Sequence, residues 1–203
     1  MFDARILDAT RGQIEAFADK LERRGLTADQ VTWAGFAIGL SALPLLALGA
    51  ELLALSAIIV NRVADGVDGA LARRQGPTDR GAFLDIVLDF IFYAAVVLGF
   101  ALQNPQQNAI TAALLLFSFM GTASSFLAFA IMAERRKLKS LEFPRKGFYY
   151  LGGLTEASET VGFFLVCCLF PLLFPLLGTL FALLCLVTTG MRIKAGIETL
   201  DNS

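Results

Sequence analysis

Four aspartates lie inside apolar sequence, where a carboxylate is costly and is by default a functional residue: Asp65, Asp68, Asp85 and Asp89. The first two are three residues apart and the last two are four apart, so each pair lies on one face of a helix. Clustered carboxylates must be protonated or held by cations, because each close pair costs roughly 4 kcal/mol at 4 Å when the dielectric constant is near 20. Oxygen ligands from two helices suit Mg²⁺ or Mn²⁺. All four aspartates are therefore predicted metal ligands.

Small residues and an arginine accompany the acidic pairs. Gly69 and Ala72 fall close to the helix face of Asp68, and Gly81 precedes the second pair. Such residues more often serve helix packing, but beside a metal site they leave space for a ligand. Arg73 adds a permanent cation that can pair with phosphate. The whole constellation predicts a diphosphate site in which metal and arginine stabilise a phosphoryl transition state.

The composition indicates an integral membrane protein. Of 203 residues, 56% are apolar and 17% charged, with a net charge of −1, and the mean hydropathy is +0.66. The absence of histidine excludes Ser-His and Cys-His catalysis and His-ligated metals, and no nucleic-acid partner is expected. Three cysteines in apolar runs are interpreted as packing residues: Cys167, Cys168 and Cys185. The length suits a single domain over residues 1–203.

The predicted fold is all-α: an amphipathic N-terminal arm followed by six transmembrane helices. The arm (1–25) has Ile14, Phe17 and Leu21 on its apolar stripe, and it either lies in the membrane interface or packs on the protein's own cytosolic face. Residues 27–30 form a capping box that opens the bundle. The bundle covers about 31–193, with apolar segments near 31–48, 52–73, 80–102, 109–132, 156–173 and 176–193.

The basic residues predict the orientation of the bundle. Of the seventeen Lys and Arg, all but Arg62 fall on the arm, near the second-to-third connection, between the fourth and fifth segments, or near the end of the sixth, where Arg192 and Lys194 mark the end of the span. The three opposite connections contain none. By the positive-inside rule, both termini and the aspartates lie at the cytoplasmic side.

The constellation resembles the signature of the CDP-alcohol phosphotransferase superfamily: Asp, two residues, Asp-Gly, two residues, Ala-Arg, a spacer, Gly, three residues, Asp, three residues, Asp. The six-helix plan and the arm extend the resemblance over most of the chain, and it is closest to a bacterial inner-membrane branch. Two features depart from the pattern. The spacer before Gly81 has seven residues, one fewer than is common, and Ala28 stands where many members have proline.

The resemblance implies a reaction and an assembly. The four aspartates would hold two divalent ions and the diphosphate of a CDP-linked donor, usually CDP-diacylglycerol in bacteria. Asp89 would act as general base on an alcohol acceptor, and CMP would leave, as in phospholipid biosynthesis. The resemblance also implies a homodimer in the bacterial inner membrane.

The sequence specifies the acceptor pocket less fully than the donor site. The basic connection 134–146, which ends at Lys146, can bind a phosphorylated acceptor or face anionic lipid. Tyr149, Glu156 and Glu159 can hydrogen-bond a polyol or a cationic alcohol, although acids are favoured at a helix N-terminus in any case. Asn61 and Arg62 precede the motif and could complete the nucleotide hollow.

Two other functions fit an aspartate-rich membrane protein. An intramembrane prenyltransferase also binds diphosphate through Mg²⁺, but it would need further aspartate motifs, and none follows Asp89. A divalent-cation transporter would carry polar residues across the whole membrane, whereas these carboxylates cluster toward one face.

Overall fold

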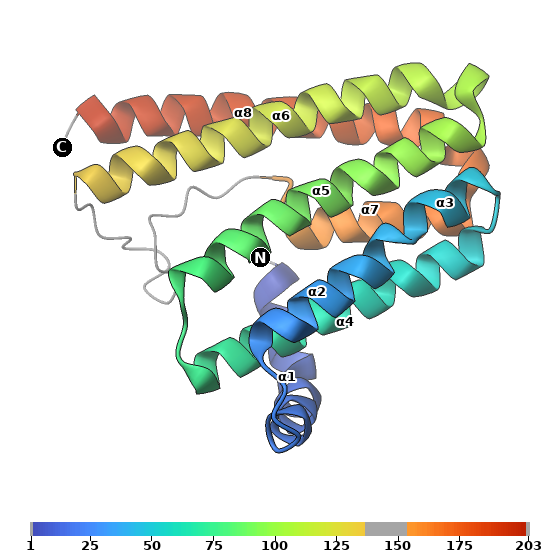
Figure 1. The fold of residues 1–203 in the computed structure, drawn as a ribbon. Helices are drawn as coiled ribbons and strands as arrows, with labels where there is room; N and C mark the ends of the chain where they lie inside the picture. The colour runs from blue at the N-terminus through green and yellow to red at the C-terminus, as the bar shows by residue number, and fades with distance from the viewer. Residues whose placement is uncertain (1, 137–153, 202–203) are drawn as a thin grey trace.

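The computed structural model describes residues 2–136 and 154–201, with side chains from residue 12 onward. The described chain is helical throughout its regular structure (Figure 1). Its elements are α1 (Phe2–Glu22), α2 (Ala28–Leu40), α3 (Ala42–Ala47), α4 (Glu51–Gln75), α5 (Asp79–Gln103), α6 (Pro105–Arg135), α7 (Ala157–Leu169), the short 3₁₀ helix η1 (Pro171–Leu173) and α8 (Phe174–Asp201). The predicted acceptor residues Lys146 and Tyr149 lie outside the described residues.

Four stretches are long and apolar enough to cross a membrane: Ala28–Ala47, Asp79–Gln103, Pro105–Arg135 and Pro171–Asp201. The helix α4 is also long, at 25 residues, but it carries the charged residues of the aspartate motif. The helix α7 is apolar and shorter. The predicted all-α, polytopic membrane protein is therefore confirmed, while the count of six spans stays a prediction.

The first predicted span is divided into α2 and α3 at Ser41. Pro44 has no N–H to donate to the carbonyl of Leu40, and its ring clashes with that carbonyl in a continuous helix. The chain instead turns at Ser41, whose hydroxyl donates to Ile38 O at 2.5 Å. The predicted capping box at the start of α2 is present, with Gln30 N–H donating to Thr27 Oγ1 at 3.4 Å and Thr27 N–H to Gln30 Oε1 at 3.1 Å.

Two glycines allow α2 to approach α4 closely. A Cβ atom added at Gly35 would lie 2.5 Å from Cβ of Ala64, and one at Gly39 would lie 2.7 Å from Cγ of Asn61. Carbon atoms normally approach only to about 3.5–4.0 Å, so any larger residue would push the helices apart. Because Ala64 precedes Asp65, this contact sets the position of the first aspartate.

An aromatic and aliphatic core lies among α3, α4, α5, α6, α7 and α8. Its largest fully buried side chains include Phe92, Phe100, Phe164 and Phe174. The cysteines of α7 and α8 belong to the same core as free, buried thiols, as predicted. The long helices α6 and α8 pack along one another (Figure 1) and both contribute buried residues to this core. The core thus fixes α5 against its neighbours.

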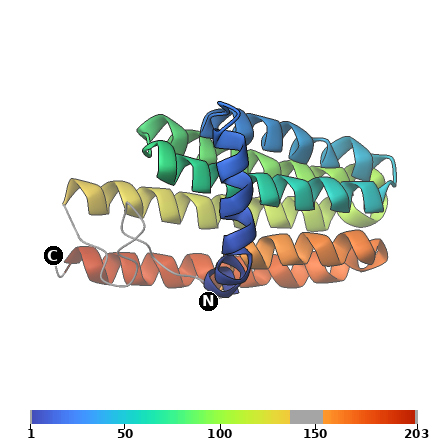
Figure 2. The same cartoon turned by 90° about the horizontal axis from the view of Figure 1, so that it is seen from below.

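The N-terminal helix α1 crosses the bundle and packs mainly on α4 (Figure 2). Ile14 and Leu21 contact the buried cluster around Val67 and Leu71, while Phe17 is 50% exposed. A second contact is ionic: the Arg74 guanidinium lies 2.8 Å from carboxylate oxygens of both Asp19 and Glu22. Of the two alternatives for the arm, packing on the protein itself is observed, and a membrane-interface position stays a prediction.

Candidate active site

A tight turn joins the two helices that carry the aspartates. Gly76 ends α4 with φ of 95°, a conformation that favours glycine. Thr78 then caps α5 by accepting the N–H of Gly81 at 3.0 Å. The short spacer is accommodated by this turn. Gly81 is close to its cap, since an added Cβ would lie 3.2 Å from Thr78 Oγ1.

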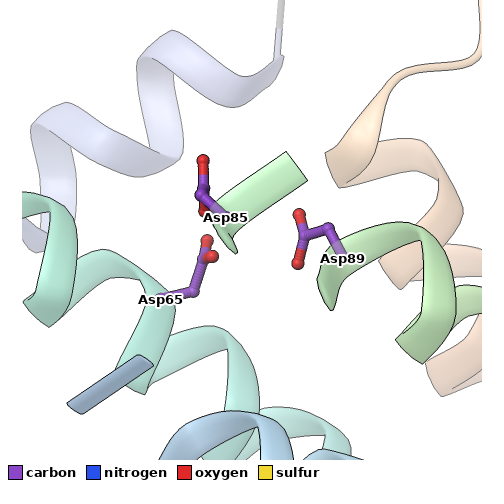
Figure 3. Close-up of side chains that lie close together, drawn as sticks. All are labelled: Asp65, Asp85 and Asp89. Atoms are coloured by element: carbon purple, nitrogen blue, oxygen red, sulfur yellow. The ribbon is translucent and has the colours of Figure 1, made fainter. Parts of the chain in front are cut away.

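Three of the four aspartates converge. Asp65 on α4 and Asp85 and Asp89 on α5 point toward one another, each with a carboxylate oxygen within 4.8 Å of the others (Figure 3). Asp68 is buried and lines the same narrow pocket, but it does not belong to this set of three. An all-oxygen donor set of this kind fits a hard divalent ion.

Arg62 lies inside this acidic cluster. Its Nη2 is 2.6 Å from Asp89 Oδ1, its Nη1 is 3.3 Å from Asp89 Oδ2, and Nη1 is also 3.6 Å from Asp65 Oδ2. The hydroxyl of Tyr93 donates to Asp89 Oδ2 at 3.4 Å. Asp89 therefore has partners on both of its oxygens.

A larger cavity of about 730 Å³ opens beside the cluster, between α5, α6, α7 and α8. Asp85 and Asp89 lie on its wall, as do Glu156 and Arg192. The remaining wall is mostly apolar and aromatic, including Phe90, Leu116, Phe119, Met120 and Phe126. A polar cluster next to an apolar cavity of this size suits an amphiphilic ligand.

A sequence profile of the CDP-alcohol phosphatidyltransferase family matches residues 26–191. The chain belongs to this family. It is 52% identical over 182 residues to the inner membrane protein YnjF of Escherichia coli K12, covering 90% of this chain and 88% of that protein. Membership makes the chain a membrane-bound transferase of phospholipid biosynthesis, and it favours this class over a prenyltransferase or a cation transporter.

Two further comparisons are more distant. The chain is 31% identical over 118 residues to the archaetidylinositol phosphate synthase of Pyrococcus horikoshii, covering 58% of this chain and 63% of the synthase. Its fold matches phosphatidylinositol phosphate synthase PgsA1 of Mycobacterium tuberculosis with CDP-DAG bound, at TM-score 0.73 and 24% identity over 90% of this chain and 92% of that one. The complex of PgsA1 with manganese and citrate matches at TM-score 0.72, 24% identity, and 90% and 88% coverage.

The other residues of this CDP-alcohol phosphatidyltransferase that were predicted to bind the CDP-linked donor lie around the aspartate cluster rather than in it. Gly69 and Ala72 follow Asp68 on α4, and Arg73 folds back so that its Nη1 would lie 3.4 Å from a Cβ at Gly69. The Arg73 side chain is 65% exposed, and its Nη2 is 3.7 Å from Glu15 Oε1. The narrow pocket around the aspartates is lined by none of Gly69, Ala72, Arg73 and Gly81.

The two predicted acceptor acids of the transferase have different positions. Glu156 lies on the wall of the large cavity. Glu159 accepts the N–H of Glu156 at 3.1 Å through Oε2, which is a capping interaction at the start of α7. The Glu156 side chain completes the same capping box by accepting the N–H of Glu159. The structure therefore places Glu156 both in the cap of α7 and beside the candidate site, and Glu159 in the cap.

Two residues of the site were not predicted from the sequence. Tyr93 follows Asp89 by four residues, so its helix face was available as a signal. Arg192 was expected only to mark the end of the last span, and that position in the membrane stays a prediction. The helix α8 continues to Asp201, and Arg192 is buried at 8% exposure, where its Nη1 donates to Thr122 O at 3.1 Å. A basic residue near a span end gave no sign that it faces inward.

Proposed function

We propose that this transferase moves a phosphatidyl group from a CDP-linked donor to an alcohol and releases CMP. The proposed donor is CDP-diacylglycerol. The observation that carries the proposal is the convergence of Asp65, Asp85 and Asp89 within 4.8 Å, beside an apolar cavity of about 730 Å³. The donor named in the PgsA1 complex supports the same donor class.

The aspartates have two roles in this proposal. Asp65, Asp68, Asp85 and Asp89 hold two divalent ions, Mg²⁺ or Mn²⁺, and the manganese of the PgsA1 complex supports this assignment. When bound, such ions neutralise the diphosphate and the departing CMP. Asp89 accepts the proton of the acceptor hydroxyl as its oxygen attacks the phosphorus that carries the lipid. The P–O bond to CMP then breaks, and CMP leaves with the bonding electrons.

The nucleotide is proposed to lie over the small residues that follow Asp68 on α4. Gly69 and Ala72 have small side chains that leave room there. Gly81 lets the start of α5 lie close to Thr78. Arg73 is a candidate phosphate ligand, because among the described side chains its exposed guanidinium pairs only with Glu15, at 3.7 Å. Exposed pairs of this kind contribute about 0–1 kcal/mol, so the exchange is inexpensive.

The placement in the cell is part of the proposal. We place the chain in the bacterial inner membrane as one domain, with both termini and the aspartates at the cytoplasmic side. The distribution of basic residues supports this orientation, and YnjF is an inner membrane protein. A homodimer is proposed from the family resemblance.

The reaction predicts metal-dependent release of CMP. Purified protein incubated with CDP-diacylglycerol, Mn²⁺ and a panel of alcohols should release CMP with at least one acceptor. Addition of EDTA should reduce release to the level without enzyme, and excess Mn²⁺ or Mg²⁺ should restore it, because the clustered carboxylates need cations. Chromatographic quantification of CMP measures the rate. CMP release that persists in EDTA would contradict the metal role.

Glu156 is predicted to contribute to acceptor binding, whereas Glu159 is not. Replacing Glu156 with Gln should raise the acceptor KM by about tenfold, the effect of losing a charged hydrogen bond of about 1.5 kcal/mol. The donor KM should change little. Glu159→Gln is the matched control, because glutamine also serves at the third position of a capping box. Steady-state kinetics with each substrate varied separately tests both variants. Equal acceptor KM values for the two would remove Glu156 from the acceptor site.

A further inference from the structure

Arg62 is a cation that already occupies the carboxylate cluster. Its guanidinium forms a bidentate pair with Asp89, at 2.6 Å and 3.3 Å, and its Nη1 lies 3.6 Å from Asp65 Oδ2. Asp65 and Asp89 are two of the three aspartates that converge within 4.8 Å. The guanidinium therefore uses the same oxygens that a divalent ion would need.

The surroundings of Arg62 hold it in this position. The Oδ1 atom of Asn61 accepts hydrogen bonds from Nε at 2.9 Å and from Nη2 at 2.6 Å. The guanidinium carbon lies 4.9 Å from the ring centroid of Phe92 and 5.7 Å from that of Tyr93. The Arg62 side chain is only 17% exposed. A partly buried, bidentate and stacked arginine is far more firmly placed than a surface ion pair.

Asn61 is itself anchored to α2. Its Nδ2 donates to Gly35 O at 3.0 Å, and its side chain fills the space left by Gly39. The close approach of α2 and α4 thus orients Asn61, and Asn61 orients Arg62. The position of the guanidinium is a consequence of helix packing as well as of charge.

The pocket leaves little room for an ion in addition to Arg62. The space between Thr32, Asn61, Arg62 and the four aspartates has a volume of about 10 Å³, enough for roughly one water-sized group. A Mg²⁺ ion needs near-octahedral oxygen coordination. Both oxygens of Asp89 are engaged by the guanidinium, so a divalent ion that coordinates Asp89 competes with the arginine for these oxygens and for the same small space.

We propose that Arg62 is a resident counter-cation that competes with the divalent ion for Asp89 and Asp65. This inference rests on the proposed metal site. Without metal, Arg62 neutralises the two carboxylates and positions Asp89. When the ion binds, the guanidinium leaves the Asp89 oxygens and stays near the site through Asn61. Arg62 therefore stabilises the metal-free protein and weakens the binding of the ion.

The proposal is tested by Mn²⁺ binding to the full-length protein in detergent, with free Mn²⁺ followed by electron paramagnetic resonance. Arg62→Met should bind Mn²⁺ about tenfold more tightly, which corresponds to about 1.4 kcal/mol. Without metal, its thermal unfolding midpoint should be lower than that of the wild type, and Mn²⁺ should raise this midpoint more. A residue with a purely structural role would lower stability without tightening Mn²⁺ binding.

A matched control removes a positive charge away from the pocket. Arg80 is exposed and lies 3.4 Å from Asp29, so Arg80→Met should leave Mn²⁺ affinity within about twofold, as expected for a screened surface charge. Arg62→Lys keeps the charge but loses the bidentate fork, and its affinity should fall between those of the wild type and Arg62→Met. Should Arg62→Met fail to fold, Arg62→Lys decides by the same criterion.

Unchanged or weaker Mn²⁺ binding in the Arg62 variants would overturn the inference. CMP release by the wild-type protein separates this failure from failure of the proposed function. Wild-type protein that binds Mn²⁺ and releases CMP, together with Arg62 variants of unchanged affinity, leaves the transferase reaction intact and removes the competition. If neither the wild type nor the Arg62 variants bind Mn²⁺, the inference falls together with the metal site.

Discussion

Asp89→Asn should reduce CMP release by on the order of 10³-fold, because general-base catalysis contributes typically 10²–10⁴-fold and the amide cannot take the proton. The substitution keeps the size of the side chain. It also removes the charge that pairs with Arg62 at 2.6 Å, so the variant must be shown to be folded by its thermal unfolding midpoint. The rate is measured by CMP release with saturating CDP-diacylglycerol, Mn²⁺ and the active acceptor.

The matched control for this variant is Asp79→Asn. Asp79 lies on the same helix, in the first turn of α5, and it is exposed. It should lose only the favourable interaction of an acid with the helix N-terminus, about 0.3–1 kcal/mol, and keep its CMP release. Retention of full activity by Asp89→Asn would remove Asp89 from the role of general base.

Gly35→Val should impair both stability and activity. The added Cβ would lie 2.5 Å from Cβ of Ala64, and neither atom belongs to a flexible side chain that can turn away. Restoring an ordinary carbon contact requires α2 and α4 to separate by about 1 Å. Overpacking of this kind costs about 1–3 kcal/mol of unfolding free energy. Because Asp65 follows Ala64, the same shift should reduce CMP release by about 10²-fold.

Gly190→Val is the control for Gly35→Val. Gly190 also lies within a helix, and no atom lies within 4 Å of an added Cβ. Both variants change glycine to the same β-branched residue, so the difference between them isolates the helix contact. The thermal unfolding midpoint and the CMP-release rate of the two variants give the comparison. Equal effects would show that the approach of α2 to α4 does not position the aspartates.

The sequence predicted much of the site because its main signals are local. Spacings of three and four residues place Asp65 with Asp68, and Asp85 with Asp89, on single helix faces whatever the rest of the chain does. The capping box at Thr27 depends on four consecutive residues, and it is present. The all-α fold was predicted from the long apolar segments. In a chain of this pattern, such segments can satisfy their backbone hydrogen bonds inside lipid only as helices.

Other features depended on contacts between distant residues. Asp68 was grouped with the other aspartates, and it lines the same narrow pocket, while the three whose carboxylates converge are Asp65, Asp85 and Asp89. Arg192 was interpreted as marking the end of a span, and the sequence did not show that its side chain is buried beside Thr122 of α6. In each case the periodicity of one helix was known, but its rotation toward a neighbouring helix was not.

The sequence alone thus determined the helices, the family signature and the type of chemistry, because residue identity and spacing fix the faces of each helix. The tertiary structure decided which carboxylates meet, that Arg62 lies between them and that Glu156 lines a cavity. These outcomes depend on how closely two helices approach and how they are rotated. Contacts such as Gly35 with Ala64, which lie 29 residues apart in the chain, set both.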